Sequence, residues 1–217
     1  MKLNKITFIT GNAAKAEQLR RHLKCPVLHK KIDLDEVQSL DLKKIVEHKS
    51  REAYKKISAQ GGPASGGKSA VLVEDVSLAF HALGKLPGPL IKWFLGELDN
   101  DGLCKMLDGY KNRNATAEVC FGLYDGKELK IFEGKMEGKI ATHPRGKTDF
   151  GWDPIFIPLE AGRPKVPVAL ARRRGRPLTG FIPKGSKKTN AEMSVKEQNK
   201  FSMRKIALKK LEMFLKK

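Results

Sequence analysis

Apolar residues in the first half of the chain fall into short runs separated by segments with helical spacing. Runs of β-branched and aromatic residues such as KITFIT predict strands, and apolar residues that recur every three or four positions predict amphipathic helices. Asp41 fits the N-cap of the second helix. The predicted elements of this half are strands at 5–10, 27–32 and 69–73 and helices at 13–23 and 41–57.

The second half of the chain holds most of the remaining strand signals. Asp125 and Gly126 stand between two strand-like runs and predict a hairpin, and the proline- and glycine-rich segment 83–89 predicts a rigid loop. The predicted elements of this half are helices at 91–98, 101–107 and 195–217 and strands at 115–124, 128–132 and 135–141. Strand–helix units, then strands, then a final helix predict an α/β fold with a mixed sheet and two lobes in one continuous domain.

Composition narrows the class of protein. The chain has 217 residues and carries 43 Lys and Arg against 24 Asp and Glu, a net charge of +19. This charge favours polyanionic partners such as nucleotides or nucleic acid, with a lysine-rich solvated surface as the simpler interpretation. The apolar runs are too short to span a membrane. Three separated cysteines argue against a disulfide framework and a structural zinc, and residues 1–10 lack the apolar core of a signal peptide, so we expect a cytoplasmic protein.

One segment differs from the rest in composition. Residues 159–183 contain six basic residues, one acid and four prolines, and five of the arginines of the chain lie within it. Three interpretations are open: a disordered solvent-exposed loop, translated non-coding sequence, or a basic arm that contacts nucleic acid.

Four short segments carry residues suited to phosphate, metal and base recognition. They are Thr10–Lys15 (TGNAAK) at the first strand-to-helix junction, Glu74–Asp75 after an apolar run, Lys92 after the proline-rich loop, and Phe150–Phe156 (FGWDPIF). A glycine turn into a helix presents backbone N–H groups to phosphate, adjacent acids suit Mg²⁺, and aromatic residues around a glycine can stack on a base. Taken singly, each segment also has a simpler interpretation: a turn with a solvated lysine, a surface acid pair, core aromatic residues or a structural turn.

In this order and spacing, the segments resemble the inosine triphosphate pyrophosphatase family, which hydrolyses ITP, dITP and XTP to the monophosphate and pyrophosphate. The matching segments are TGNAAK, KIDLDE, VEDVSLAF, LGKLPGPLIKWF, PRGKTDFGWDPIF, TNAEM and NKFSMRKIALKKL. The resemblance covers the chain apart from 60–68 and 159–183, and so implies one such domain over 1–217 with a basic Arg/Pro-rich insert at 159–183. It also implies an elongated mixed β-sheet with flanking helices, two lobes around a central cleft, and a homodimer.

The resemblance implies roles for individual residues. Asp75 matches the general base and, together with Glu36, a ligand of Mg²⁺, with Mn²⁺ as an alternative metal. The residues that it implies for the substrate are Thr10, Gly11, Asn12, Ala13, Ala14, Lys15, Lys49 and Lys92 at the phosphates, and Phe150, Gly151, Trp152, Asp153 and Arg204 at the purine. Several cations with Mg²⁺ suit a triphosphate, and a carboxylate can deprotonate the attacking water.

The chain departs from the family pattern at two positions besides the insert. The family's Ser-His-Arg signature has Met203 in place of the histidine, and Gln198 replaces a lysine that usually precedes the asparagine, with Lys200 as a candidate substitute. Purine selectivity is the part of the resemblance that these changes affect most. They also leave a second hypothesis: a nucleotide- or nucleic-acid-binding homologue with lost or altered catalysis. Nucleic-acid binding through the insert is not favoured, and no membrane partner is expected.

Overall fold

The computed structural model describes residues 5–23, 25–59, 69–148, 151–159 and 187–216. Phe150 and all but the first residue of the 159–183 segment therefore lie outside the described residues. The strands are β1 (Lys5–Ile9), β2 (Val27–Lys30), β3 (Ser69–Phe80), β4 (Pro87–Gly88), β5 (Asn114–Tyr124), β6 (Leu129–Ile140) and β7 (Phe156–Pro158). The helices are α1 (Ala13–His22), α2 (Leu42–Ala59), α3 (Ile91–Lys105), α5 (Val195–Gln198) and α6 (Met203–Leu215), with short 3-10 turns at His81–Leu83 and Asn190–Glu192.

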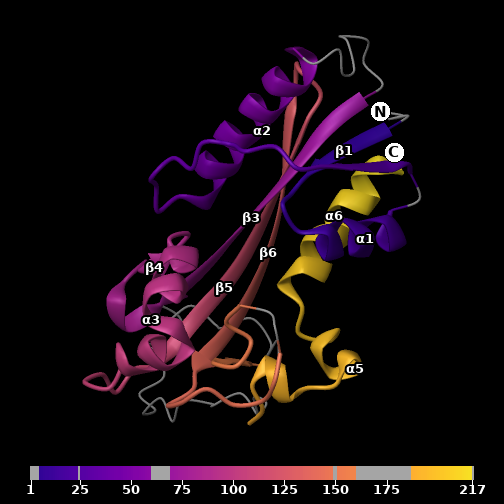
Figure 1. Cartoon of the computed structure of the whole chain (residues 1–217). Coiled ribbons are helices and arrows are strands. Elements are labelled where there is room, and N and C mark those ends of the chain that lie inside the picture. Colours follow the sequence, from indigo (N-terminus) through magenta and orange to yellow (C-terminus); the bar gives the residue numbers. More distant parts are fainter. Residues whose placement is uncertain (1–4, 24, 60–68, 149–150, 160–186, 217) are drawn as a thin grey trace, which may run out of the picture.

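These strands form one seven-stranded sheet in the order β2-β1-β3-β5-β6-β7, with β4 paired to β3. The sheet is mixed, because β1 runs parallel to β2 and β3 while the other pairs are antiparallel. It is elongated, with helices gathered at both of its ends (Figure 1). The predicted α/β class and the mixed sheet with flanking helices are confirmed.

Helices cover both faces of the sheet at the end that contains β1 (Figure 1). α1 and α6 lie on one face, where Leu19 and Leu208 share an apolar cluster with Phe121 of β5. α2 lies on the opposite face, where Val46 belongs to a second cluster with Val73 of β3. A third cluster, at the other end of the sheet, includes residues of α3, β3, β5 and β7. At the end that contains β1, side chains on one face of β3 therefore meet α1 and α6, and side chains on the opposite face meet α2.

Strand β3 runs through both ends of the sheet and is paired unevenly along its two edges. On one edge β5 pairs with almost its whole length. On the other edge β1 pairs with residues 69–72 and β4 with residues 78–79. Within the described structure, residues 73–77 have no strand partner on that edge. Glu74 and Asp75 lie in this unpaired stretch, and their side chains point to opposite faces of the sheet because they are neighbours in a strand.

Two predicted strand boundaries are wrong. The strand predicted at 69–73 continues to Phe80, because the acids that interrupt its apolar run are paired with cations, as described below. The strands predicted at 128–132 and 135–141 are one continuous strand, β6. Gly134 interrupts the strand-like sequence there, but its lack of a side chain leaves room for the start of α6.

The helix predicted at 195–217 is also wrong as a single element. It is divided into α5 and α6, and Ser202 caps α6 by accepting a hydrogen bond from the backbone N–H of Lys205 at 3.1 Å. Phe201 packs against the cluster around α3, whereas Leu208 packs with α1, so apolar residues of the predicted single helix belong to two different cores. The predicted break between 98 and 101 is confirmed, since Asp99 interrupts α3 with a φ of 53°. The hairpin at 125–126 and the Asp41 cap are also confirmed.

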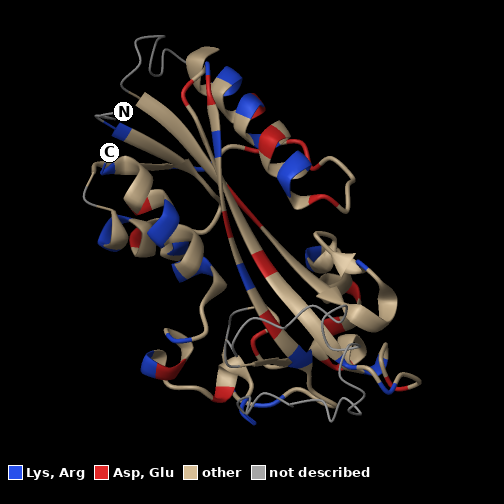
Figure 2. Ribbon diagram, turned by 180° about the vertical axis from the view of Figure 1, so that it is seen from behind, with Lys and Arg blue, Asp and Glu red and all other residues tan. Residues whose placement is uncertain are grey.

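Lys and Arg are spread over the helices of both ends of the molecule, while several Asp and Glu lie on the strands (Figure 2). Among the described residues this distribution fits the simpler interpretation of the net charge, a lysine-rich solvated surface. None of the helices in the described part of the chain combines the length and hydrophobicity that a membrane span needs.

The close approach of α6 to β6 gives a prediction for stability. A Cβ atom at Gly134 would lie 1.8 Å from the backbone oxygen of Met203. To relieve this clash, the backbone of β6 or of α6 would have to move. We expect Gly134→Ala to lower the free energy of unfolding by about 1–3 kcal/mol or more, measured by urea denaturation. Gly96→Ala is the matched control, because a Cβ at Gly96 has no neighbour within 4 Å and an alanine in a helix stabilises by about 0.5–1 kcal/mol. Equal effects of both substitutions would contradict this packing argument.

Candidate active site

The segment Thr10–Lys15 forms the turn from β1 into α1, as predicted. The hydroxyl of Thr10 accepts a hydrogen bond from the backbone N–H of Asn12 at 3.1 Å, and the side chain of Asn12 caps α1 by accepting from the backbone N–H of Lys15 at 3.2 Å. A Cβ at Gly11 would have no neighbour within 4 Å, so the turn is open to a ligand. The first turn of α1 contains no acid. This arrangement suits phosphate at the helix N-terminus.

Glu74 projects from β3 toward α1 and α6 and is held between two cations. Its carboxylate lies 3.1 Å from Nζ of Lys15 and 2.7 Å from Nη2 of Arg204, and it accepts a hydrogen bond from Nη1 of Arg204 at 2.9 Å. The guanidinium also lies over the ring of Phe121, 5.5 Å from its centroid. Burial lowers the pKa of Arg204, and the charge of Glu74 opposes that effect. Lys15, predicted at the phosphates, and Arg204, predicted at the purine, therefore meet at one carboxylate.

Asp75 projects to the opposite face of β3, toward α2. Its Oδ2 accepts a hydrogen bond from Nζ of Lys49 at 2.6 Å, and its Oδ1 accepts from the backbone N–H of Val76 at 2.8 Å. Both carboxylate oxygens are thereby held in place. Burial pulls the pKa of Lys49 down, but the charges and hydrogen bonds of Asp75 and Glu36 outweigh burial and raise it.

The two predicted metal ligands are brought together by lysines. Oε1 of Glu36 lies 3.5 Å from Nζ of Lys49 and 3.4 Å from Nζ of Lys92, and Lys49 in turn contacts Asp75. No three His, Cys, Asp or Glu side chains within the described ranges come close enough to form a metal site on their own. Two carboxylates without further protein ligands fit Mg²⁺, which retains waters and binds substrate phosphates, better than a metal that needs a full protein cage.

The segment around Trp152 forms a tight turn before β7. Asn100 donates a hydrogen bond to the backbone oxygen of Gly151 at 3.0 Å, and Asn190 donates to Oδ1 of Asp153 at 3.2 Å. Burial raises the pKa of Asp153. Trp152 packs against the cluster that contains α3. Hydrogen bonds and packing thus hold this turn in place, and its role in base recognition remains a prediction.

Sequence reasoning missed several residues that position this site. Asn100 and Asn190 hold the turn, and Gln198 donates through Nε2 to the backbone oxygen of Asn190 at 2.7 Å. Gln198 therefore supports the partner of Asp153, although it differs from the lysine of the family pattern. The sequence shows Glu74 only as one of two adjacent acids, because its partners come from both ends of the chain and no local signal reveals them.

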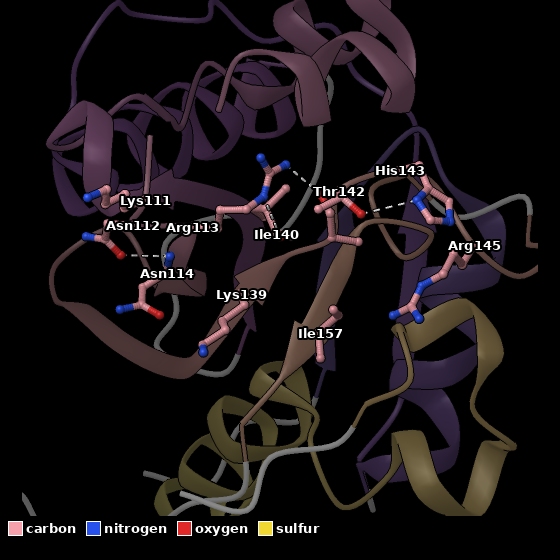
Figure 3. A pocket seen from close by; sticks show the side chains of 11 residues that line it. Lys111, Asn112, Arg113, Asn114, Lys139, Ile140, Thr142, His143, Arg145 and Ile157 are labelled. Atoms are coloured by element: carbon pink, nitrogen blue, oxygen red, sulfur yellow. Dashed lines mark hydrogen bonds between the residues drawn. The ribbon is translucent and has the colours of Figure 1, made fainter. Parts of the chain in front are cut away.

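A separate pocket of about 520 Å³ is lined by none of these residues (Figure 3). It lies at the end of β6 and is lined by Lys111, Asn112, Arg113, Asn114, Lys139, Ile140, Ala141, Thr142, His143, Arg145 and Ile157. The guanidinium of Arg113 donates to the backbone oxygens of Cys104, Ile140 and Ala141, and Arg145 donates to that of Lys187. These arginines hold loops together, so the pocket is basic without being a built anion site.

Comparison with known proteins agrees with this architecture. An inosine triphosphate pyrophosphatase of Puccinia graminis f. sp. tritici is 38% identical over 95% of this chain and 94% of its own length, and inosine triphosphate pyrophosphatase 2 of Trypanosoma cruzi is 36% identical over 94% and 89%. A HAM1 protein structure from Coxiella burnetii has a TM-score of 0.72 at 22% identity and 99% coverage of both chains, which shows the shared fold. Residues 6–166 match the Ham1 family. With that match covering most of its length, the chain belongs to the Ham1 family.

Proposed function

We propose that the protein hydrolyses non-standard purine nucleoside triphosphates such as ITP, dITP and XTP to the monophosphate and pyrophosphate, and so cleanses the nucleotide pool. The relatives named inosine triphosphate pyrophosphatase support this activity. The observation that carries it is the convergence of predicted phosphate, metal and catalytic residues at the unpaired stretch of β3. There Asp75 contacts Lys49, Lys49 contacts Glu36, and Glu74 contacts Lys15 and Arg204.

The cations of the site would bind the triphosphate. Lys15 stands in the first turn of α1, whose N-terminal N–H groups add a favourable dipole for phosphate. Lys49 and Lys92 approach Glu36 from α2 and α3, respectively. Three lysines from three helices can neutralise several phosphate oxygens at once, which a triphosphate requires.

Asp75 would orient and deprotonate the attacking water. Its two oxygens are already fixed by Lys49 and the backbone of Val76, so little movement is needed to present a lone pair to water. Glu36 and Asp75 would hold Mg²⁺ or Mn²⁺, which when bound supplies positive charge to the phosphates. Metal dependence is part of this proposal.

The purine would be recognised near the turn at 151–153. Trp152 offers a ring for stacking, Asp153 can accept from a base N–H group, and Arg204 can donate to the 6-oxo group of inosine or xanthosine. A donor at this group would disfavour adenine, because adenine has an amino group there and would leave the donor unpaired. Phe150, the remaining residue of the predicted purine set, lies outside the described residues.

The rest of the predicted organisation is part of the same proposal. The chain would form one domain over 1–217 with an Arg/Pro-rich insert at 159–183, act as a homodimer and reside in the cytoplasm. The rival hypothesis is a nucleotide- or nucleic-acid-binding homologue with lost or altered catalysis. The contacts of Lys49 with both Asp75 and Glu36 favour the enzyme.

Pyrophosphate release tests the proposed function. We expect release from ITP, dITP and XTP in the presence of Mg²⁺ to exceed that from ATP and GTP, and Asp75→Asn to reduce turnover by at least about a hundredfold. Asp75→Asn preserves side-chain volume, so its circular dichroism and melting temperature control for folding. Turnover by Asp75→Asn above about a tenth of the wild-type rate, a loss under ~1.4 kcal/mol, would contradict the assigned role. Absence of pyrophosphate release from every nucleotide in the panel would favour the rival hypothesis.

Asp153 gives a prediction in which stability and activity change in opposite directions. Its pKa is raised by burial, so its charged form costs stability above the unfolded-state pKa, and this cost disappears as the pH falls. Asp153→Asn, which can still accept from Asn190, should therefore raise the free energy of unfolding at pH 7 and change it less at acidic pH. It should lower kcat/KM for ITP about 10- to 100-fold, since a charged hydrogen bond of ~1.5–3 kcal/mol is lost. A stability gain that grows on acidification would refute the burial argument.

Met203 gives a prediction for base selectivity. A methionine cannot donate a hydrogen bond, whereas the histidine of the family pattern can. Met203→His should raise the ratio of kcat/KM for ITP over ATP roughly tenfold, because a donor at the 6-oxo group favours inosine over adenosine and one hydrogen bond contributes ~0.5–1.5 kcal/mol or more. Deletion of residues 159–183 is the comparison variant. If the deletion improves the ratio and Met203→His does not, the insert rather than Met203 limits selectivity.

A further inference from the structure

Glu74 has no role in the reaction proposed above, yet it contacts two residues of the predicted substrate-binding set, Lys15 and Arg204. Its side chain is 3% exposed, and the side chain of Arg204 is 11% exposed. Asp75, its neighbour in the strand, points to the other face and serves the metal and catalytic set. Glu74 can therefore position predicted substrate-binding residues without contacting the attacking water or the predicted metal ligands.

Burial makes the contacts of Glu74 mutually dependent. A buried carboxylate is tolerated only when it is paired, and a buried guanidinium likewise needs its counter-charge. Lys15 comes from the first helix of the chain and Arg204 from the last, and both use the same carboxylate. Nη2 of Arg204 also lies 3.4 Å from the backbone oxygen of Lys15, which joins the two cations a second time. The Nε group of Arg204 is buried and has no hydrogen-bond partner among the described residues, so the guanidinium depends heavily on Glu74.

We propose that Glu74 is a positioning residue that holds Lys15, predicted at the phosphates, beside Arg204, predicted at the base. Because both cations contact one carboxylate, they lie side by side and would meet neighbouring parts of one nucleotide. This inference rests on the proposed function, because that function assigns Lys15 and Arg204 to the same substrate. A competing effect has the opposite sign: Glu74 could merely mask the two cations, in which case its removal would strengthen anion binding.

The test uses the full-length chain and ligands that need no turnover. Glu74→Gln keeps the volume and removes the charge, and Glu74→Asp keeps the charge but is one methylene too short to hold both cations. Glu118→Gln is the matched control, because Glu118 is paired with Lys135 at 2.7 Å on the neighbouring strand and contacts none of the substrate set. Calorimetry measures binding of inorganic tripolyphosphate, which reports the phosphate side, and of inosine monophosphate, which adds the base.

We expect Glu74→Gln to raise the Kd of both ligands about tenfold or more, because the unpaired Arg204 and Lys15 lose their fixed positions. Glu74→Asp should raise the Kd of at least one ligand, and Glu118→Gln should change neither beyond about twofold. In a double-mutant cycle, Glu74→Gln added to Lys15→Ala should weaken tripolyphosphate binding much less than it does in the wild type. With ITP, KM should rise more than kcat falls, since Asp75 is untouched.

Tighter tripolyphosphate binding by Glu74→Gln would overturn the proposal in favour of masking, and additive effects in the cycle would overturn it as well. If Glu74→Gln does not fold, unchanged binding of both ligands by a folded Glu74→Asp overturns it. Wild-type protein that binds both ligands but releases no pyrophosphate from ITP refutes the proposed function alone, and weaker binding by the Glu74 variants then still supports the positioning role. Wild-type protein that binds neither ligand refutes both.

Discussion

The alternation of side chains along β3 is the constraint on which the site depends. Glu74 and Asp75 are consecutive residues of a strand, so they must point to opposite faces of the sheet. Each face is covered by different helices: α1 and α6 on one, α2 on the other. The two acids consequently collect two separate groups of cations. An insertion of one residue before Glu74 would exchange the faces and separate both acids from their partners.

The gap in strand pairing beside Glu74 and Asp75 is the second feature on which the site depends. Within the described residues, β1 pairs with β3 only up to residue 72 and β4 pairs with it only from residue 78. The edge of β3 between them is therefore left to side chains and to the turn that starts at Thr10. Ligands of open α/β sheets commonly bind beyond the ends of parallel strands, where backbone groups are not used by neighbours. The apolar cores lie at the two ends of the sheet, and the predicted catalytic acid Asp75 lies in the unpaired stretch between them.

Local patterns were sufficient to predict most elements but not how the charged residues are satisfied. Helical spacing and β-branched runs located α1, α2, β1 and β5, and the break in α3, because these signals depend on neighbours in sequence. The end of β3 was misplaced at Glu74, since the stability of two acids within a strand comes from Lys15, Lys49 and Arg204, which are distant in sequence. The division of the last helix places Phe201 and Leu208 in different cores, and the continuous β6 approaches the backbone of α6 at Gly134; both features depend on residues distant in sequence. The site residues were predicted through resemblance; their contacts required the fold.

The central claim is that this arrangement cleaves a nucleoside triphosphate between its α- and β-phosphates. Phosphorus NMR of ITP incubated with the protein and Mg²⁺ measures this directly, because it distinguishes the products by their signals. Our account predicts inosine monophosphate and pyrophosphate in equal amounts, with no orthophosphate at early times. Formation of inosine diphosphate with orthophosphate would show cleavage at the terminal phosphate and would contradict the account.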